Sequence, residues 1–268
     1  MKEITVHSYD ELHRLVFEDC YDETLGRYRN NIVYRGVCNK DYRLMSKLNR
    51  ICAHDLTLES SIIRSFRKYG FADLQDSSSF WQLVATGQHF GLPTRLLDWS
   101  YSPLVAAHFA TEDIYEYDKD GAIFAIDLHE GFSSLPDVLR NELERSHASS
   151  FSLSMLEKYA NDFEELRALS DKPFFLFYEP AASNDRIANQ YALFSVCSDS
   201  SKLITDLVDD EYTTLRKIII PKEVKLEIRD KLDYINISER MLYPGLDGIC
   251  SWITRHYADL SIVNKKEE

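Results

Sequence analysis

The stretch QHFGLPTRLLDWSYSPLVAAHFA, residues 88–110, says more about the fold than any other part of this 268-residue chain. Gly91 followed by Pro93 predicts the end of a helix that begins near a run of serines, because glycine favours the position after a helix and proline cannot continue one. Ser102 followed by Pro103 predicts the start of another helix, with serine as the N-cap and proline in the first turn. The stretch therefore predicts two helices joined by a short connection.

Polar side chains gather around this connection. Arg95 and Asp98 stand three residues apart, and we expect a buried ion pair that shapes a turn through LLDW, or alternatively an Asp98 that faces a pocket. Gln88 and His89 lie at the predicted helix C-terminus, where a histidine interacts favourably with the helix dipole. An N-cap role for Ser102 is compatible with a functional one, since the free N–H groups of a helix N-terminus bind phosphate.

Residues 31–37, NIVYRGV, predict a strand because they are rich in β-branched and aromatic residues. Side chains alternate along a strand, so Arg35 faces away from Tyr34 and shares a half-apolar face with its valine neighbours. A guanidinium on such a face needs an anionic partner, either an internal carboxylate or a bound phosphate. Gly36 permits close approach of another backbone or of a ligand.

Periodicity elsewhere predicts early helices and later strands without regular alternation, which favours an α+β fold. We expect a mixed or antiparallel central sheet with flanking helices, built as a single domain over residues 1–268. Residues 132–172 are polar and helical in period, so they predict a helical insertion that either packs on the core or protrudes from it.

Composition narrows the function classes. The net charge of −13 argues against a broad nucleic-acid surface, although residues 27–50 carry seven basic residues against one acidic residue. No window reaches the roughly eighteen apolar residues of a membrane helix, and no signal peptide is evident, so we expect a cytoplasmic protein that does not enter membranes. The chain lacks phosphate-binding glycine motifs, the GxSxG elbow and zinc-ligand spacing, and we expect no metal site. We expect its five cysteines to be reduced.

Two later segments contain further candidate residues. Arg186 and Gln190 lie one helical turn apart before a strand, so both side chains can face one cavity. Gln190 is neutral and can bind ribose or amide groups, but it cannot act as a general base. Near the end of the chain, Glu239 and Asp247 are candidate acids, although the glycines beside Asp247 also indicate a turn-stabilising role.

The order of VYRG, the 88–110 block, RIANQYALF and LYPGLDGI resembles the FRG domain family over about residues 30–250, with Tyr34 in place of the family's phenylalanine. The arrangement resembles, more distantly, the Arg-Ser-Glu class of ADP-ribosyltransferases. That resemblance implies an ADP-ribosyltransferase-like fold in which Arg35 binds the pyrophosphate of NAD. Ser102, or Ser100 nearby, would then steady the nicotinamide side. Gln190 occupies the place where that class has a glutamate.

The resemblance implies an enzyme that takes NAD as substrate, cleaves its nicotinamide–ribose bond, and passes ADP-ribose to a macromolecule or to water. A role as a bacterial toxin or phage-defence effector is an extrapolation from it. The implied catalytic residues are Arg35, Ser102 and Gln190, with Glu239 or Asp247 as an alternative carboxylate. The implied nucleotide-binding residues are Arg35, Tyr34, Gln88, His89, Arg95, Asp98, Trp99 and Arg186, with Tyr34 or Trp99 stacking on a ring.

Two other functions remain open from the sequence. The same pocket would serve a non-catalytic module that binds a nucleotide or a partner, which the missing glutamate favours. A metal-assisted nuclease or hydrolase would use Asp98, Asp247 and Glu239.

Overall fold

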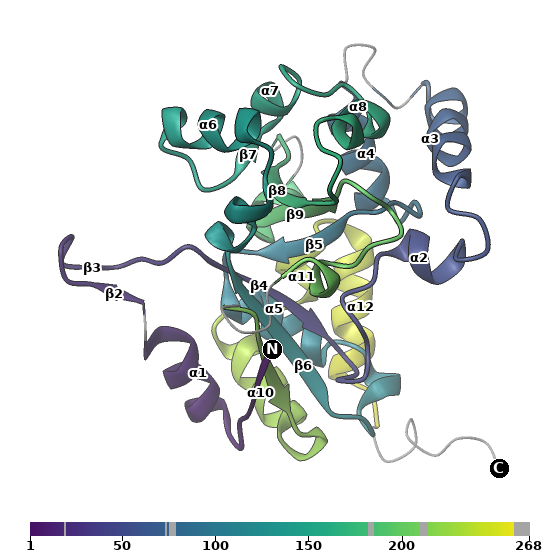
Figure 1. The fold of residues 1–268 in the computed structure, drawn as a ribbon. Coiled ribbons are helices and arrows are strands. Elements are labelled where there is room, and N and C mark those ends of the chain that lie inside the picture. The colour runs from purple at the N-terminus through teal and green to yellow at the C-terminus, as the bar shows by residue number, and fades with distance from the viewer. Residues whose placement is uncertain (19, 73, 75–78, 182–184, 209–213, 260–268) are drawn as a thin grey trace.

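A mixed eight-stranded sheet forms the centre of the computed structural model, which describes residues 1–18, 20–72, 74, 79–181, 185–208 and 214–259 (Figure 1). Neighbouring strands are antiparallel except at the two edges, where β1 pairs with β10 and β7 pairs with β8 in parallel. The predicted α+β class with a mixed sheet is confirmed. In spatial order the strands are β1 (Lys2–Thr5), β10 (Arg216–Ile220), β6 (Gly121–Asp127), β4 (Ile32–Val37), β5 (Leu97–Ser100), β9 (Ala192–Cys197), β8 (Phe175–Glu179) and β7 (Phe151–Ser152).

Helices flank this sheet, and a short ribbon of β2 (Tyr21–Asp22) and β3 (Arg27–Tyr28) stands apart from it. In the part of the chain that the structure describes, no helix combines the length and the apolar character needed to cross a membrane. The α-helices are α1 (Tyr9–Glu18), α2 (Lys47–Ile51), α3 (Leu58–Tyr69), α4 (Phe80–His89), α5 (Pro103–Thr111), α6 (Asp137–Ser146), α7 (Leu153–Leu156), α8 (Phe163–Ala168), α9 (Asp185–Asn189), α10 (Lys222–Tyr234), α11 (Glu239–Leu242) and α12 (Leu246–His256). Short 3-10 helices follow three of the elements: η1 (Ile114–Glu116), η2 (Leu128–Ser134) and η3 (Ile204–Asp206).

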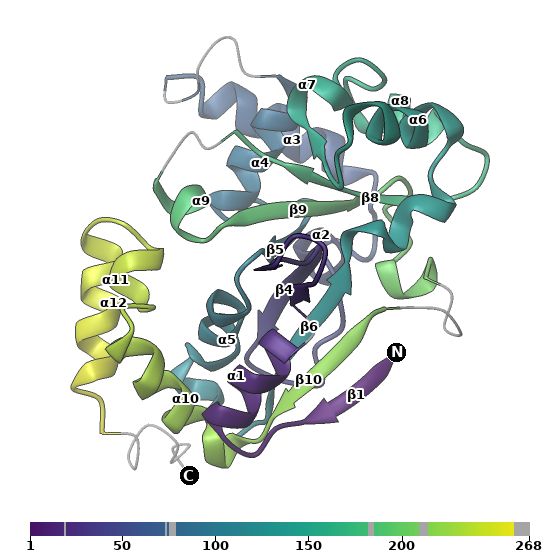
Figure 2. The same ribbon diagram turned by 90° about the vertical axis from the view of Figure 1, so that its left-hand side faces the viewer.

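Helix α5 lies against β4 and β6, with α10 and α1 packed beyond it (Figure 2). Its alanines at 106, 107 and 110 are fully buried against Tyr34 and the β6 residues Ile123 and Ala125. Small residues on a helix let it approach a sheet closely, which removes water from both surfaces. The apolar sequence SPLVAAHFA thus specifies a helix that is buried between the sheet and α10.

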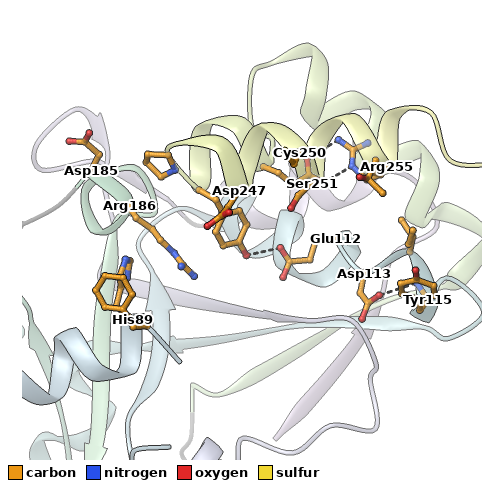
Figure 3. A pocket seen from close by; sticks show the side chains of 16 residues that line it. His89, Glu112, Asp113, Tyr115, Asp185, Arg186, Asp247, Cys250, Ser251 and Arg255 are labelled. Atoms are coloured by element: carbon orange, nitrogen blue, oxygen red, sulfur yellow. Dashed lines mark hydrogen bonds and ion pairs between the residues drawn. The ribbon is translucent and has the colours of Figure 1, made fainter. Parts of the chain in front are cut away.

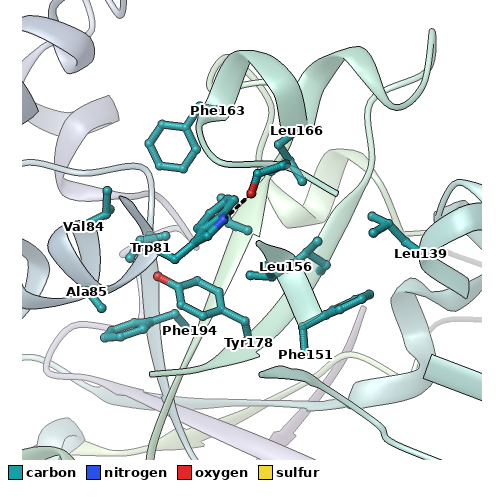
Figure 4. Close-up of a cluster of buried hydrophobic side chains, with 14 of the residues drawn as sticks. Trp81, Val84, Ala85, Leu139, Phe151, Leu156, Phe163, Leu166, Tyr178 and Phe194 are labelled. Atoms are coloured by element: carbon teal, nitrogen blue, oxygen red, sulfur yellow. Dashed lines mark hydrogen bonds between the residues drawn. The ribbon is translucent and has the colours of Figure 1, made fainter. Parts of the chain in front are cut away.

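The predicted insertion packs onto the other half of the sheet. Trp81 of α4 has no exposed surface and donates its indole N–H to the carbonyl of Ala160 over 2.8 Å (Figure 4). Phe163 of α8 meets the Trp81 ring edge-on, and Tyr178 of β8 closes the other side. Buried aromatic pairs of this kind add stability beyond their area. Helices α6 to α8 therefore form part of the core rather than a protrusion.

Local signals placed the helix starts correctly, but the LLDW prediction was wrong. Ser79 and Ser102 cap α4 and α5, each accepting a hydrogen bond from a backbone N–H three residues on. LLDW, predicted as a turn with an Arg95–Asp98 ion pair, begins strand β5 instead. Arg95 pairs with the buried Glu59 of α3. The partner lies 36 residues upstream, so spacing within the stretch did not reveal it.

The sheet divides between β4 and β5. Among the described residues these strands pair in register at Tyr34 and Ser100 alone. Beyond that point Arg35 to Val37 stay paired with β6, while Leu97 to Trp99 stay paired with β9. Each strand keeps one neighbour and loses the other, so the two halves of the sheet diverge. The divergence leaves backbone groups and side chains facing each other across a gap.

Candidate functional site

A cavity of about 390 Å³ opens at this division of the sheet. Its walls come from β4, β5, the C-terminal ends of α4 and α5, and the segment from α9 into β9. A larger cavity of about 850 Å³ lies beside it, between α9, α12 and the end of α5 (Figure 3). The two share His89, Glu112, Asp113 and Arg186 as lining residues, so they adjoin each other. Both volumes fall in the range typical of small-molecule sites.

Arg35 bridges the division. Its Nη1 donates to the backbone carbonyl of Asp98 over 2.7 Å and lies 3.5 Å from the Asp98 carboxylate. The side chain is 17% exposed, and burial lowers the pKa of its guanidinium. Nε and Nη2 have no hydrogen-bond partner among the described residues. The guanidinium therefore keeps donors available at the cavity while it replaces a missing bond between β4 and β5.

Gln88 and Asp98 form the wall behind Arg35. The amide nitrogen of Gln88 donates to Asp98 over 2.7 Å, and its amide oxygen accepts from the hydroxyl of Thr94 over 2.6 Å. These two contacts fix the orientation of the Gln88 amide. Asp98 also contacts Arg35 and lines the smaller cavity. Of the two predictions made for Asp98, the one in which it faces a pocket therefore describes its position.

The serines divide their roles. Ser102 Oγ accepts from the Val105 N–H, which confirms the predicted N-cap, and Ser102 is not among the residues that line either cavity. Ser100 does line the smaller cavity, and it donates to the carbonyl of Gln190 over 2.7 Å. Gln190 also lines this cavity, and its amide nitrogen donates a hydrogen bond to the carbonyl of Leu242 over 3.0 Å. Arg35, Ser100 and Gln190 are therefore brought together at the smaller cavity. Ser102 lies outside it, with its backbone N–H bonded to the Ser100 hydroxyl.

Arg186 extends from α9 to the junction of the two cavities (Figure 3). Its guanidinium lies over the ring of Tyr243, 4.6 Å from the centroid, an arrangement favoured by the ring quadrupole. Its buried Nε has no hydrogen-bond partner. A buried donor without a partner is unfavourable, so a ligand acceptor at this point would be stabilised. Nearby His89 has a lowered pKa, because of burial and then because of Arg186.

Carboxylates occupy the wall formed by the end of α5. Glu112, the C-cap residue, accepts hydrogen bonds at Oε2 from Tyr243 over 2.8 Å and from His108 at 3.2 Å. Its Oε1 accepts none from the described residues. Asp113 and Glu116 line the smaller cavity beside it, and one buried oxygen of Glu116 lacks a partner. Cationic and anionic groups thus face each other across the site.

Other predicted residues either line neither cavity or line one with little exposed surface. Arg95 lines neither cavity: its Nε donates to Glu59 over 2.7 Å and its Nη1 to the carbonyl of Ser198. Tyr34 and Trp99 are 3% and 2% exposed, which leaves almost no ring surface for stacking. Glu239 lines the larger cavity, but it is 4% exposed and paired with Arg255. Its carboxylate is therefore neutralised within the protein.

Asp247 also lines the larger cavity, from the first turn of α12 (Figure 3). The sequence placed it in a turn between glycines; Gly245 does make the sharp bend, with φ at +98°, but Asp247 is already helical. Within the described ranges, no group of three or more His, Cys, Asp or Glu side chains is arranged to hold a metal ion.

Sequence reasoning missed three contributors. Glu112 stands in an ordinary helix ending, Tyr42 occupies a loop without a motif, and Tyr243 lies in LYPGLDGI but was not singled out. Tyr42, which is 45% exposed, gives the smaller cavity an aromatic surface that Tyr34 and Trp99 do not offer. A carboxylate one residue past an apolar helix was the signal available for Glu112, and it is common to many helices.

Cys38 lines the smaller cavity, but its thiol is poorly suited to act as a nucleophile. Burial raises its pKa to about 11, and the Sγ donates to the carbonyl of Phe109. At pH 8 about one thiol in a thousand would be ionised, and the thiolate is the reactive form. We therefore expect iodoacetamide to modify exposed Cys250 first, with Cys38 reacting faster as the pH rises toward 11. Equal rates at pH 8, measured by peptide mass spectrometry, would contradict this.

Residues 30–119 match the family model described as the FRG domain. The chain contains an FRG domain. The matched range runs from just before β4 to just after η1, so it includes Arg35, Gln88, Asp98 and Ser100 of the divided sheet. Gln190, Arg186 and α12 lie beyond the matched range. No curated protein matches the chain, and no solved structure does.

Proposed function

We propose that this FRG domain protein binds NAD at the divided sheet and cleaves the nicotinamide–ribose bond. One observation carries the proposal: two arginines with unused donors, Arg35 and Arg186, line the same cavity as a group of carboxylates. A dinucleotide with a cationic base has this charge pattern, because its pyrophosphate is anionic and its nicotinamide ring is positive. Arg35 suits the pyrophosphate since a guanidinium forms paired hydrogen bonds to phosphate oxygens.

The carboxylate wall suits the other end of the same ligand. When the bond between ribose C1′ and the nicotinamide nitrogen breaks, its electron pair leaves with nicotinamide, and positive charge develops on the ribose. A carboxylate such as Glu112 stabilises that charge by electrostatic attraction. An incoming hydroxyl then forms the new C–O bond at C1′, and its proton passes to the carboxylate.

The larger cavity is the proposed approach for the acceptor. It meets the smaller one at Glu112 and Arg186, so a nucleophile entering there arrives beside the bond that breaks. Water or a macromolecular side chain would serve as the acceptor. A cytoplasmic toxin or phage-defence effector remains the biological setting that we propose.

Removing Arg35 tests the ligand assignment. We expect Arg35→Ala to weaken NAD binding by roughly 10- to 100-fold, because a hydrogen bond to a charged group contributes about 1.5–3 kcal/mol. Arg35→Lys keeps the charge but loses the paired hydrogen bonds of the guanidinium. Its affinity for NAD should therefore lie between those of the wild type and Arg35→Ala. Calorimetric titration with NAD and a chromatographic assay of nicotinamide release measure the two effects.

The control is Arg43→Ala, an exposed arginine of the same basic segment that lines neither cavity. Its affinity for NAD should equal that of the wild type, and melting temperatures would show that each variant is folded. Absence of nicotinamide release in the wild type would overturn the proposed cleavage, and absence of NAD binding would overturn the ligand assignment as well.

A non-catalytic nucleotide-binding module is the second candidate. It is favoured by Gln190, which replaces a carboxylate and whose amide nitrogen is committed to the carbonyl of Leu242. Such a module would be stabilised by NAD or ADP-ribose in a thermal-shift assay while releasing no nicotinamide.

A further inference from the structure

A line of hydrogen bonds leads from the core to the junction of the cavities. Arg229 of α10, with no exposed side-chain surface, donates to the carbonyl of Ile237 and is in close contact with Nδ1 of His108. His108 is fully buried in α5, and its Nε2 lies 3.2 Å from Oε2 of Glu112. The Tyr243 hydroxyl donates to the same oxygen. Two donors, His108 of α5 and Tyr243 after α11, thus converge on one carboxylate oxygen, and Arg229 of α10 lies behind His108.

The contact with Arg229 determines where His108 carries its proton. A guanidinium has N–H donors and no acceptor, so the facing Nδ1 must offer its lone pair. The proton of the neutral ring then sits on Nε2, which donates to Glu112. Burial lowers the pKa of His108, the hydrogen bond to Glu112 raises it, and Arg229 lowers it. The net direction is downward, which agrees with a neutral ring. The opposite tautomer would set two N–H groups against each other.

The charges around Arg229 are internally balanced. Asp233 accepts from both Arg229 and Arg255, and Arg255 also pairs with Glu239. These two arginines and two carboxylates together carry no net charge. His108 separates this neutral cluster from Glu112, whose side chain is 29% exposed and faces the cavities. Glu112 therefore forms no ion pair with either arginine of this cluster.

We propose that the Arg229–His108 pair is a positioning device for Glu112, holding Oε2 through the Nε2–H tautomer and presenting Oε1 to the ribose. The proposal rests on the proposed cleavage of NAD. His108 touches no ligand; it acts through Glu112. Tyr243 supplies the second donor to Oε2, so the carboxylate cannot rotate without losing two hydrogen bonds. Geometry held in this way matters because a misplacement of about 1 Å reduces catalysis on the order of a hundredfold.

The tautomer can be measured without any activity. In protein labelled with ¹⁵N-histidine, the ring nitrogen shifts and their couplings to ring protons identify which nitrogen is protonated. The signal of His108 is the one absent from His108→Phe. We expect a neutral ring with the proton on Nε2 at pH 7, held down to a lower pH than an ordinary histidine. Arg229→Met should raise the pKa of His108, because it removes the facing cation.

Kinetics test the positioning role. His108→Phe keeps a ring but loses the donor, so we expect kcat for nicotinamide release to fall roughly 10- to 100-fold while KM stays within about threefold. His108→Gln restores an N–H toward Glu112 and should recover most of the loss. Glu112→Gln measures how far kcat falls when the carboxylate itself is lost. Asp118→Asn, an exposed acid of the same loop outside both cavities, is the charge control.

The outcomes separate the two proposals. Absence of nicotinamide release in the wild type would overturn the proposed function, and the labelled spectra would then still decide on the tautomer. A His108 ring protonated on Nδ1, or on both nitrogens at pH 7, would overturn the positioning proposal whatever the activity. So would equal kcat losses in His108→Gln and His108→Phe when both variants melt near the wild-type temperature.

Discussion

Gly36→Ala is expected to destabilise the protein by at least about 3 kcal/mol, the upper range of overpacking a well-packed core. A methyl group at this position would lie 1.9 Å from the carbonyl oxygen of Ala106 and 2.7 Å from the backbone nitrogen of Ala110. Both atoms belong to the backbone of α5, which cannot turn aside as a side chain can. The whole helix would have to move away from β4. Urea denaturation followed by circular dichroism measures the free energy of unfolding.

Gly87→Ala is the matched control for this substitution. Its methyl group would meet the end of the Leu92 side chain at 2.7 Å, which can rotate, and alanine favours a helix interior over glycine by about 1 kcal/mol. We expect little net change in stability there. A Gly36→Ala protein as stable as the wild type would show that α5 is less tightly packed against β4 than these distances indicate. Since Gly36 adjoins Arg35, the same displacement would also disturb the site.

Glu59→Gln is expected to lower the free energy of unfolding by about 3 kcal/mol, the lower end for breaking a buried ion pair. Glu59 is 2% exposed and accepts from the side chain and the backbone N–H of Arg95. The substitution leaves the guanidinium without a carboxylate next to the ring of Phe163, which lies 4.0 Å away. The same pair joins α3 to the segment before β5 and to the turn after β9, so its loss affects the half of the sheet that contains β5 and β9.

Arg95→Met distinguishes a structural role from nucleotide binding. We expect lower stability with an unchanged affinity for NAD, since Arg95 lines neither cavity. A double variant, Glu59→Leu with Arg95→Met, should regain part of the stability, because both charges leave the interior together. A large loss of NAD affinity in a fully stable Arg95→Met protein would instead restore Arg95 to the binding site.

Local patterns predicted the elements well where one residue type has a local physical preference. The serines at 79 and 102 predicted two helix starts, because a side-chain oxygen can bond only to N–H groups nearby. The β-branched run at 31–37 predicted β4 to within one residue. The short strand β5 was missed, because four residues carry little periodicity. Its conformation depends on pairing with β9, which lies almost a hundred residues away.

The candidate site shows the same limit. Arg35 and Asp98 were singled out because a charge in an apolar setting requires a partner, and the two were indeed brought together. Arg95 was paired with the wrong acid, since its partner Glu59 lies 36 residues upstream on α3. Glu112 was missed because its neighbours are ordinary; His108, Arg229 and Tyr243 reach it only after α5, α10 and the turn past α11 have packed.

By itself, then, the stretch at 88–110 determined the end of one helix, the capped start of the next and the polar character of their connection. Those features depend on interactions within a few residues, which the order of side chains specifies directly. The tertiary structure alone decided that LLDW is a strand, that the sheet divides beside it, and which acid meets which base. Such outcomes depend on contacts between segments far apart in the chain, whose geometry is settled only when the core excludes water and each buried charge must find a partner.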